Sequence, residues 1–267
     1  MSAAATLTEA LAPVRADPAR SAVLLDVDGT LSPIVRHAED AQVPEPTRAV
    51  LIRVARRYGC VACVSGRQAT MARRIVALGS IAYLGNHGIE LLRSGTTQPE
   101  LDREAAAWQR RVHQFATKAN DAELRRLRVR FEDKGPIVGF HWRGTPDEEA
   151  AEVAVKGVAE RAEQAGFHTH WGRKVLEIRP PMPLDKGRGI HWLLRDADLD
   201  AAVYVGDDRT DVDAFRGLRE LVDGGRLTHA VCVGVRSEET PGELEASADV
   251  LVDGTRGVRD LLEALLD

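Results

Sequence analysis

Two acidic side chains stand at the end of an apolar run near the start of the chain. Residues 22–25 are Ala-Val-Leu-Leu, and Asp26, Asp28, Gly29 and Thr30 follow them. Such a run is typical of a buried strand, because side chains on both faces are hydrophobic. Unpaired buried carboxylates are unfavourable, so we expect this pair to lie at a rim or to bind a cation. A plain strand-ending Asp-Gly turn is the alternative.

Polar residues also follow three other apolar runs. These runs, at 60–64, 81–84 and 201–205, predict further buried strands. The polar residues after them are Ser65, Gly66 and Arg67, then Asn86 and His87, then Asp207, Asp208 and Asp211, with Lys186 ahead of the last group. In open parallel sheets the carboxyl ends of the strands meet at one edge, where ligands bind. We therefore expect these side chains to gather near Asp26 and Asp28.

The expected group suits phosphoryl transfer through a covalent intermediate. A carboxylate nucleophile such as Asp26 can approach an anionic phosphate only when nearby cations temper its charge. Lys186 is one such cation, and Mg²⁺, which prefers carboxylate oxygens and water, is the other. Ser65 and Lys186 can donate hydrogen bonds to phosphate oxygens. Asp28 can protonate the leaving alcohol and then deprotonate water.

The pattern of elements changes near residue 100 and changes back near residue 184. On either side, strands alternate with helices, as in a parallel sheet with helices on both faces. The helices are expected at 1–20, 47–57, 68–77, 184–194 and 258–266, with later strands at 229–235 and 250–252. Between them, the expected order is a helix (101–119), two strands (127–134 and 137–143), a helix (146–165) and two strands (167–171 and 174–179). The sequence thus predicts an α/β core, residues 1–100 and 184–267, with an inserted α+β domain (αββαββ), residues 101–183.

The first strand pair of the insert alternates between apolar and polar residues. Glu132, Lys134, His141 and Arg143 are expected on one polar face, which Glu177 from a later strand can join. Carboxylates and cations on one sheet face suit the binding of sugar hydroxyls. Solvated strand charges are the alternative for Glu132, Lys134 and Arg143.

Other candidate residues also have purely local explanations. Arg67 can cap a helix or brace its loop, and Asp208 can cap the helix that follows it. His87 and His141 can serve as local hydrogen-bonding residues. Cys60 and Cys63 match a redox motif, but inside an apolar strand they are expected to be buried thiols.

Composition limits the class of protein. The 267 residues include 36 Lys plus Arg and 41 Asp plus Glu, a formal net charge of −5. This mild acidity argues against a general nucleic-acid or membrane-surface binder. No run approaches the roughly 18 apolar residues of a spanning helix. Residues 1–20 lack a secretory pattern, and three cysteines suggest no disulfide framework, so we expect a cytoplasmic protein.

Four motifs, in their order along the chain, resemble those of the haloacid dehalogenase (HAD) superfamily of phosphatases. They are Asp26-Val-Asp-Gly-Thr30, Ser65-Gly-Arg67, Lys186 and Gly206-Asp-Asp-Arg-Thr-Asp211. The resemblance implies a HAD-like Rossmannoid core, with Asp26 as the nucleophile that forms an aspartyl phosphate. Asp28 would be the general acid/base, and Ser65 and Lys186 would hold the phosphate. Mg²⁺ would be bound by Asp26, the Asp28 carbonyl and Asp207, with Asp211 supporting it. The insert resembles the larger, C2-type cap of this superfamily.

Within that superfamily, the chain is most similar to the trehalose-6-phosphate phosphatases. The matching segments are 85–90, 132–134, 141–143, 177–180 and 185–187. The resemblance implies Mg²⁺-dependent hydrolysis of trehalose 6-phosphate, with the cap closing over the sugar. It implies as substrate-binding residues Ser65, Gly66, Arg67, Asn86, His87, Glu132, Lys134, His141, Arg143 and Glu177. Val212, where the family commonly has an acid, and Trp142, where Tyr is usual, depart from its pattern.

Other functions stay open at this point. A phosphatase with the same core could act on sucrose phosphate, a mannosyl phosphate or a pseudo-sugar phosphate. A phosphohexomutase would isomerise sugars without net release of phosphate. A non-catalytic sugar-phosphate sensor would bind without turnover. The expected partner is a small-molecule sugar phosphate, with neither nucleic acid nor membrane. Functional coupling to a trehalose-phosphate synthase stays open, and a monomer is favoured.

Overall fold

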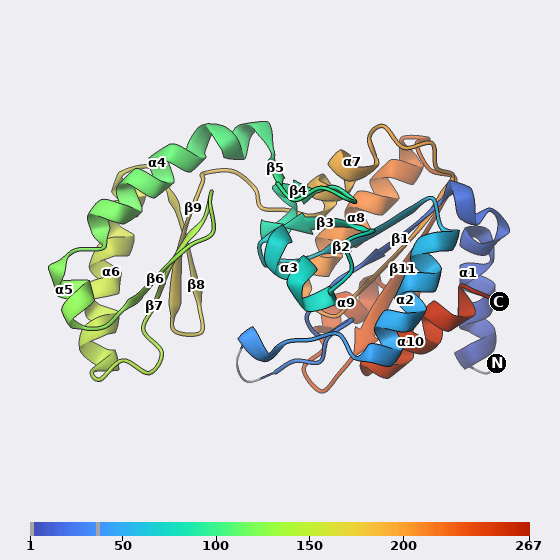
Figure 1. Cartoon of the computed structure of the whole chain (residues 1–267), viewed down its shortest axis with the longest axis horizontal. Coiled ribbons are helices and arrows are strands. Elements are labelled where there is room, and N and C mark those ends of the chain that lie inside the picture. The colour runs from blue at the N-terminus through green and yellow to red at the C-terminus, as the bar shows by residue number, and fades with distance from the viewer. Residues whose placement is uncertain (1–2, 36–37) are drawn as a thin grey trace. The chain divides into compact units, whose positions relative to one another are not determined.

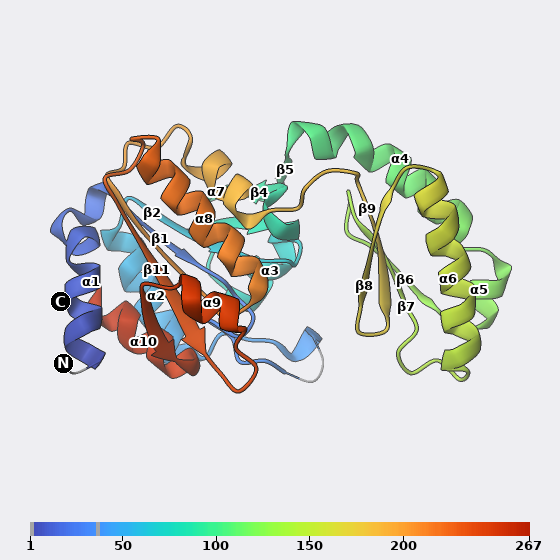
Figure 2. The same cartoon turned by 180° about the vertical axis from the view of Figure 1, so that it is seen from behind.

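The computed structural model describes residues 3–35 and 38–267, and of residues 3–6 and 38 it describes the backbone alone. The chain divides into two compact units (Figures 1 and 2). The larger unit comprises Met1–Glu100 and Leu184–Asp267, and the smaller unit comprises Leu101–Pro183.

The larger unit is built on a sheet that has eight strands in the described residues. Their order is β12-β11-β10-β1-β2-β3-β4-β5. Neighbours from β12 to β3 pair in parallel, and β4 is antiparallel to β3. The strands are β1 (Ser21–Leu25), β2 (Cys60–Val64), β3 (Ala82–Gly85), β4 (Glu90–Leu92), β5 (Glu100–Leu101), β10 (Ala201–Gly206), β11 (His229–Arg236) and β12 (Val250–Asp253). The parallel register brings the carboxyl ends of β10, β1, β2 and β3 to one edge.

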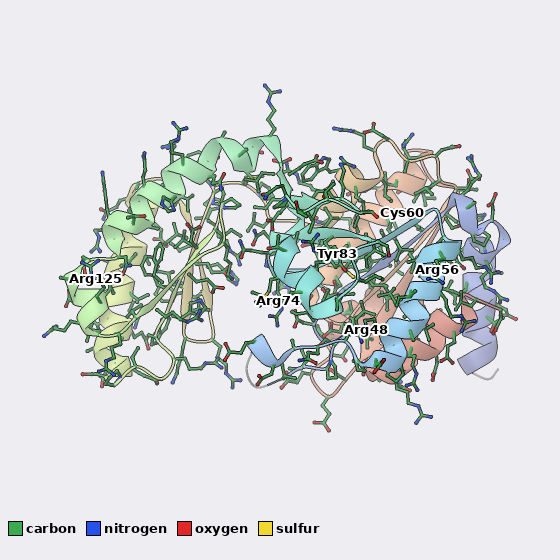
Figure 3. The ribbon with its side chains drawn as sticks, viewed as in Figure 1. Arg48, Arg56, Cys60, Arg74, Tyr83 and Arg125 are labelled. Carbon is green, nitrogen blue, oxygen red and sulfur yellow. The ribbon has the colours of Figure 1, made fainter. Side chains whose placement is uncertain are left out.

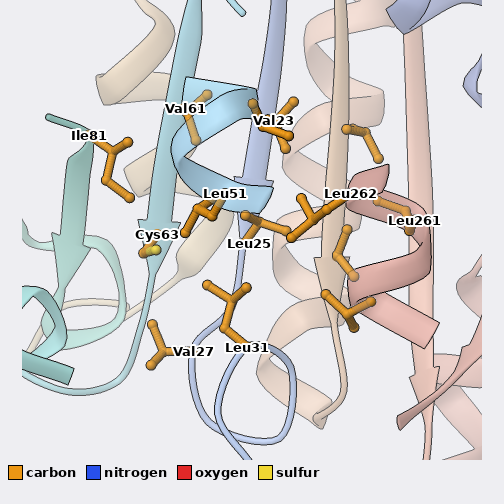
Figure 4. Packing of buried hydrophobic residues seen from close by; sticks show 14 of the residues in the cluster. Val23, Leu25, Val27, Leu31, Leu51, Val61, Cys63, Ile81, Leu261 and Leu262 are labelled. Carbon is orange, nitrogen blue, oxygen red and sulfur yellow. The ribbon is translucent and has the colours of Figure 1, made fainter. Parts of the chain in front are cut away.

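Helices cover both faces of this sheet, as the two opposite views show (Figures 1 and 2). One layer consists of α1 (Ala3–Ala16), α2 (Glu45–Arg57), α3 (Ala69–Val76) and α10 (Gly254–Ala264). The other consists of α7 (Lys186–Leu194), α8 (Arg209–Asp223) and α9 (Gly242–Ser247). Side chains of β1 alternate between the two layers: Val23 and Leu25 pack on the first, and Ala22 and Leu24 on the second. Figure 4 shows Leu25 in the first layer beside Leu262 of α10.

The predicted α/β architecture with helices on both faces is confirmed. Three of its elements, β4, β5 and α9, were not predicted. Two or three residues are too few for the alternating pattern of a strand, and the six residues of α9 are too few for a helical repeat of apolar residues. The helix predicted over 1–20 ends at Ala16, since Asp17 and Pro18 begin a short 3-10 turn, and residues 1 and 2 lie outside the described chain.

The smaller unit contains an antiparallel sheet in the order β6-β7-β9-β8. The strands are β6 (Arg130–Asp133), β7 (Val138–His141), β8 (His168–Gly172) and β9 (Val175–Arg179), and the helices are α4 (Arg103–Ala119), α5 (Ala122–Arg126) and α6 (Glu148–Gln164). Val138, Phe140, Leu176 and Ile178 pack with apolar residues of the helices in one hydrophobic cluster. The opposite face of the sheet is polar.

The first predicted strand of this unit is shorter than expected. The strand expected at 127–134 begins only at Arg130. The unpredicted helix α5, capped by Asp121, precedes it, and Arg128 has a left-handed backbone with φ of 58°. A residue in that conformation interrupts an extended strand.

Cys63 is buried, as the sequence predicts, whereas Cys60 is half-buried. Within the described residues all three cysteines are free, and burial raises the pKa of Cys60 to about 11. Figure 3 shows the side chains of Arg56, Arg74 and Arg125 on the outside of their helices. Among the described helices, none combines the length and the apolar character needed to cross a membrane.

Candidate active site

Lys186 lies between two carboxylates at the carboxyl edge of the core sheet. Its Nζ donates to Asp26 Oδ1 at 2.8 Å and to Asp211 Oδ1 at 2.7 Å. Asp26 is the first residue after β1, and Lys186 is the first residue of α7, whose start is capped by Asp185. The three charged groups are all buried. The predicted meeting of Asp26, Lys186 and Asp211 is therefore present in the structure.

Asp211 is held by four donors. Besides Lys186, Tyr204 donates its hydroxyl to Oδ1 at 2.6 Å. The amides of Asp207 and Asp208 each donate to Oδ2 at 2.9 Å. A carboxylate offers about four lone-pair sites, so these donors use them all. A Cβ on Gly206 would lie 2.2 Å from the Asp211 carboxyl carbon, so glycine is required there.

Three carboxylates gather closely enough to hold a cation. Asp26, Asp207 and Asp211 each offer an oxygen, and these oxygens lie within 4.8 Å of one another. Thr30 donates its hydroxyl to Asp207 Oδ1 at 3.0 Å. Gly29 has a φ of 82°, and a Cβ there would meet Asp207 Oδ2 at 2.0 Å. Oxygen ligands of this kind fit Mg²⁺.

Burial and mutual repulsion perturb these acids in the metal-free protein. Burial raises the pKa of Asp26 well above its usual range, against the opposing effect of Lys186. Burial and the neighbouring Asp211 raise the pKa of Asp207 to about 7. Burial acts to lower the pKa of Lys186, but Asp211 and Asp26 outweigh it and raise the pKa. A bound divalent cation would relieve this crowding of negative charge.

Asp28 is paired with Arg67. Arg67 Nε donates to Asp28 Oδ2 at 2.6 Å, and its Nη2 donates to Oδ1 at 2.7 Å. The pair is partly exposed. Arg67 therefore has a specific partner in the candidate site, beyond the loop-bracing role that the sequence left open.

The loop after β2 and the loop after β3 form one unit. The amide of Asn86 donates to the Arg67 carbonyl at 2.7 Å, and that of His87 donates to the Ser65 carbonyl at 3.1 Å. A Cβ on Gly66 would lie 2.7 Å from His87 Cε1, so the ring packs on the glycine. The predicted residues Ser65, Gly66, Arg67, Asn86 and His87 are thus brought together.

Asp208 has a different place from its acidic neighbours. It is the N-cap of α8, and its Oδ1 accepts from the amides of Thr210 at 2.8 Å and Asp211 at 3.2 Å. Lys186 Nζ lies 3.9 Å from it. These contacts agree with the helix-capping alternative for Asp208.

Tyr204 was missed by the sequence prediction because it lies in an apolar strand with no local signal of its role.

The polar face of the smaller sheet carries two hydrogen-bonded pairs of side chains. His141 Nε2 and Glu132 Oε2 lie 2.6 Å apart, and Lys134 Nζ donates to Glu177 Oε1 at 2.8 Å. Gly139 lies opposite both Glu132 and Glu177 in the register. Glycine in a strand interior leaves room for the close approach of a ligand.

Arg143 lies outside the strands that carry that face. It lies beyond the end of β7, is exposed, and its Nη2 donates to the Arg173 carbonyl at 3.1 Å. The predicted alternation extended the strand two residues too far, because a turn begins after His141.

The core sheet, the aspartate directly after its first parallel strand, the buried lysine and the inserted α+β unit together make up a haloacid dehalogenase-like fold. A haloacid dehalogenase-like hydrolase from Bacteroides thetaiotaomicron has this fold, with a TM-score of 0.62, 13% identity, and coverage of 91% of this chain and 98% of that one. The chain belongs to the trehalose-phosphatase family, whose sequence profile matches residues 24–253.

Curated relatives and solved structures agree with that membership. Trehalose 6-phosphate phosphatase RA3 of Zea mays is 31% identical over 243 residues, which are 84% of this chain and 64% of that protein. A trehalose-phosphate phosphatase of Mycobacterium avium is 31% identical over 251 residues, 92% and 62% of the two chains. The chain thus spans about three fifths of the length of the curated relatives it matches.

Two solved structures share the fold at lower identity. A trehalose-6-phosphate phosphatase related protein superposes with a TM-score of 0.69 at 21% identity, covering 91% of this chain and 95% of that one. The C-terminal domain of Candida albicans trehalose-6-phosphate phosphatase gives a TM-score of 0.68 at 19% identity, covering 97% and 96%.

Proposed function

We propose that the chain is a Mg²⁺-dependent phosphatase that hydrolyses trehalose 6-phosphate to trehalose and inorganic phosphate. The observation that carries this proposal is the buried set of Asp26, Lys186 and Asp211 with the half-buried Asp207 beside it, in a chain of the trehalose-phosphatase family. The set combines a carboxylate nucleophile with a cation that can temper its charge.

In the proposed reaction, a carboxylate oxygen of Asp26 attacks the phosphorus, and the bond between phosphorus and the sugar oxygen breaks. Asp28 donates its proton to that leaving oxygen. Asp28 then takes a proton from water, which attacks the aspartyl phosphate and releases phosphate and the free Asp26 carboxylate. Ser65 and Lys186 donate hydrogen bonds to the phosphate oxygens. Arg67 orients the Asp28 carboxylate through its two hydrogen bonds.

The donor set suits Mg²⁺ bound by the side chains of Asp26 and Asp207 and by the Asp28 carbonyl. When bound, the ion supplies positive charge that offsets the acids and the phosphate. Asp211 has its acceptor positions occupied by Lys186, Tyr204 and two main-chain amides. We therefore assign Asp211 a supporting role, in which it fixes Lys186 and the turn that carries Asp207.

The polar face of the smaller sheet is proposed to bind the sugar. Glu132, His141, Lys134 and Glu177 present carboxylate oxygens and N–H donors on one face, with the bare backbone of Gly139 between them. Gly66, Asn86 and His87 are proposed to contribute from the core unit. The proposed sugar site does not include Arg143, which lies beyond this face.

The proposed function includes a cytoplasmic location and a trehalose-phosphate synthase as the source of the substrate.

The test is phosphate release from a panel of sugar phosphates, with and without Mg²⁺, using Asp26→Asn as the inactive control. Strong preference for trehalose 6-phosphate that requires Mg²⁺ and Asp26 is the expected result. Turnover of another sugar phosphate in the panel would keep the chemistry and overturn the substrate. Binding without turnover would favour a non-catalytic sugar-phosphate sensor.

A further inference from the structure

Glu90 is a buried carboxylate that the proposed reaction does not use. It is the first residue of β4 and is 4% exposed. Its Oε2 accepts hydrogen bonds from the amide of Ala69 at 2.8 Å and from Asn86 Nδ2 at 3.2 Å. One oxygen atom therefore joins the first residue of α3 to the turn that follows β3.

Helix α3 depends on this distant acceptor because its own cap supplies none. Its N-cap residue, Gln68, makes no side-chain capping hydrogen bond in the described chain. The first amides of a helix need acceptors from outside, and a carboxylate near a helix N-terminus is favourable. Glu90 meets this need from another element. Burial nonetheless raises its pKa, with the Ala69 hydrogen bond acting against that rise.

The spacing between the two elements leaves no room for adjustment. A Cβ on Gly85 would lie 2.2 Å from the Ala69 nitrogen and 2.6 Å from Glu90 Oε2. The next two residues, Asn86 and His87, have left-handed backbones with φ of 50° and 57°. Non-glycine residues hold this conformation only when their surroundings fix it. Glu90 contributes to those surroundings through the hydrogen bond that it accepts from Asn86 Nδ2.

We propose that Glu90 is a positioning residue: through its shared oxygen it fixes the loop of Ser65, Gly66 and Arg67 against the turn of Asn86 and His87. The inference rests on the proposed function, in which Ser65 binds phosphate and Arg67 orients Asp28. What Glu90 supplies is an acceptor at a fixed distance, and its charge is secondary. The length of the side chain should therefore matter more than its ionisation.

Two variants separate length from charge. Glu90→Gln keeps the length and an acceptor oxygen but loses the charge, whereas Glu90→Asp keeps the charge and withdraws the oxygen by one methylene. We expect Glu90→Gln to have kcat and KM for trehalose 6-phosphate close to those of the wild type. We expect Glu90→Asp and Glu90→Ala to lose roughly 10- to 100-fold in kcat/KM, since small misplacements of reacting groups have effects of that size.

Asp249→Ala provides the matched control. Asp249 accepts the amide of Cys232 at 2.7 Å in the same unit, from a carboxylate outside the candidate site. This control should lose thermal stability but keep its kcat/KM per folded molecule. If Glu90→Ala behaves like the control, Glu90 is merely structural and the proposal is overturned. If Glu90→Asp is active and Glu90→Gln impaired, charge decides and the proposal is overturned as well. Should Glu90→Ala fail to fold, the comparison of Gln with Asp still decides.

Two measurements without turnover keep this inference distinct from the proposed function. Hydrogen exchange at the Ala69 amide should accelerate in Glu90→Asp and stay slow in Glu90→Gln. The affinity for inorganic phosphate, titrated in the presence of Mg²⁺, should fall in Glu90→Asp and stay unchanged in Glu90→Gln. If the wild type releases phosphate from no sugar phosphate, the proposed function fails, and these two measurements still confirm or refute the role of Glu90.

Discussion

Arg67 donates two parallel hydrogen bonds to the Asp28 carboxylate, of 2.6 Å from Nε and 2.7 Å from Nη2. The contact joins the loop after β1 to the loop after β2, 39 positions apart in the chain. The planar guanidinium matches both carboxylate oxygens at once, which an ammonium group cannot do. The proposed acid/base is thereby oriented before any substrate arrives.

The first prediction concerns this pair. Asp28→Asn should lower kcat by roughly 10²- to 10⁴-fold, the usual contribution of general acid–base catalysis. Arg67→Lys should lower kcat by less, because the charge remains while the fixed orientation is lost. Steady-state phosphate release measures both. An Arg67→Lys enzyme with unchanged kcat would contradict the orienting role.

The second prediction concerns the buried lysine. Lys186→Met should reduce the free energy of unfolding of the metal-free protein by about 3–5 kcal/mol, because Asp26 and Asp211 would be left as buried charges without their cation. Urea denaturation in EDTA measures the loss. The double variant Lys186→Met with Asp26→Asn should recover part of it. Equal stability of the wild type and Lys186→Met would refute the assigned role.

The third prediction concerns metal binding. Saturating Mg²⁺ should raise the melting temperature of the wild type, and an ion at about 100 times its Kd stabilises the folded state by about 2.7 kcal/mol. Asp207→Asn should abolish this shift. Without metal, the same variant should melt higher than the wild type, since a half-buried negative charge beside Asp211 is removed. Differential scanning calorimetry with EDTA and with Mg²⁺ covers all four conditions, and an undiminished Mg²⁺ shift in Asp207→Asn would count against the site.

The fourth prediction concerns acid stability of the smaller unit. Burial acts to raise the pKa of Glu177, but Lys134 and Arg179 outweigh it and lower the pKa to about 2 from an ordinary value of 4.5. The folded state therefore binds fewer protons than the unfolded state between these values. The stabilisation is complete above pH 4.5 and is lost as the pH falls through about 2.

Glu177→Gln should remove this pH-dependent contribution. The difference in stability between wild type and variant should shrink as the pH falls from 6 to 2, when measured by hydrogen exchange of amides in β9. Glu152→Gln, on the exposed face of α6, is the control, since its partner Lys156 is solvent-exposed. If the difference in stability between the wild type and Glu177→Gln is the same at pH 6 and at pH 2, the Lys134 and Arg179 contacts do not act on Glu177.

The meeting of the strand-end residues was predictable because parallel strands bring their carboxyl ends to one edge. That rule alone brings Asp26, Ser65 and Asp207 together from distant parts of the chain. It gives no information on Tyr204 or Glu90, whose roles depend on which way one side chain points inside a packed layer. Such contacts arise from tertiary packing and leave no spacing pattern in the sequence.

The smaller unit was predictable to a similar degree and for a similar reason. Alternation with period two places Glu132, Lys134 and His141 on one face of a strand pair. The same rule fails where a strand stops, as it does before Arg143, and it cannot indicate a five-residue helix such as α5. Short elements and strand ends are set by local turns and caps, here Asp121 and the left-handed Arg128.

The hydrophobic cluster of the smaller unit draws only on residues between 108 and 178, whereas both clusters of the larger unit draw on residues outside that range. A substitution in the cluster of the smaller unit therefore removes no residue from the two clusters of the larger unit. If the proposed sugar site is correct, the polar face around Gly139 can change under selection while Asp26 and Lys186 stay unchanged. The proposed function thus makes the smaller sheet the part of the chain to randomise in directed evolution for a new substrate.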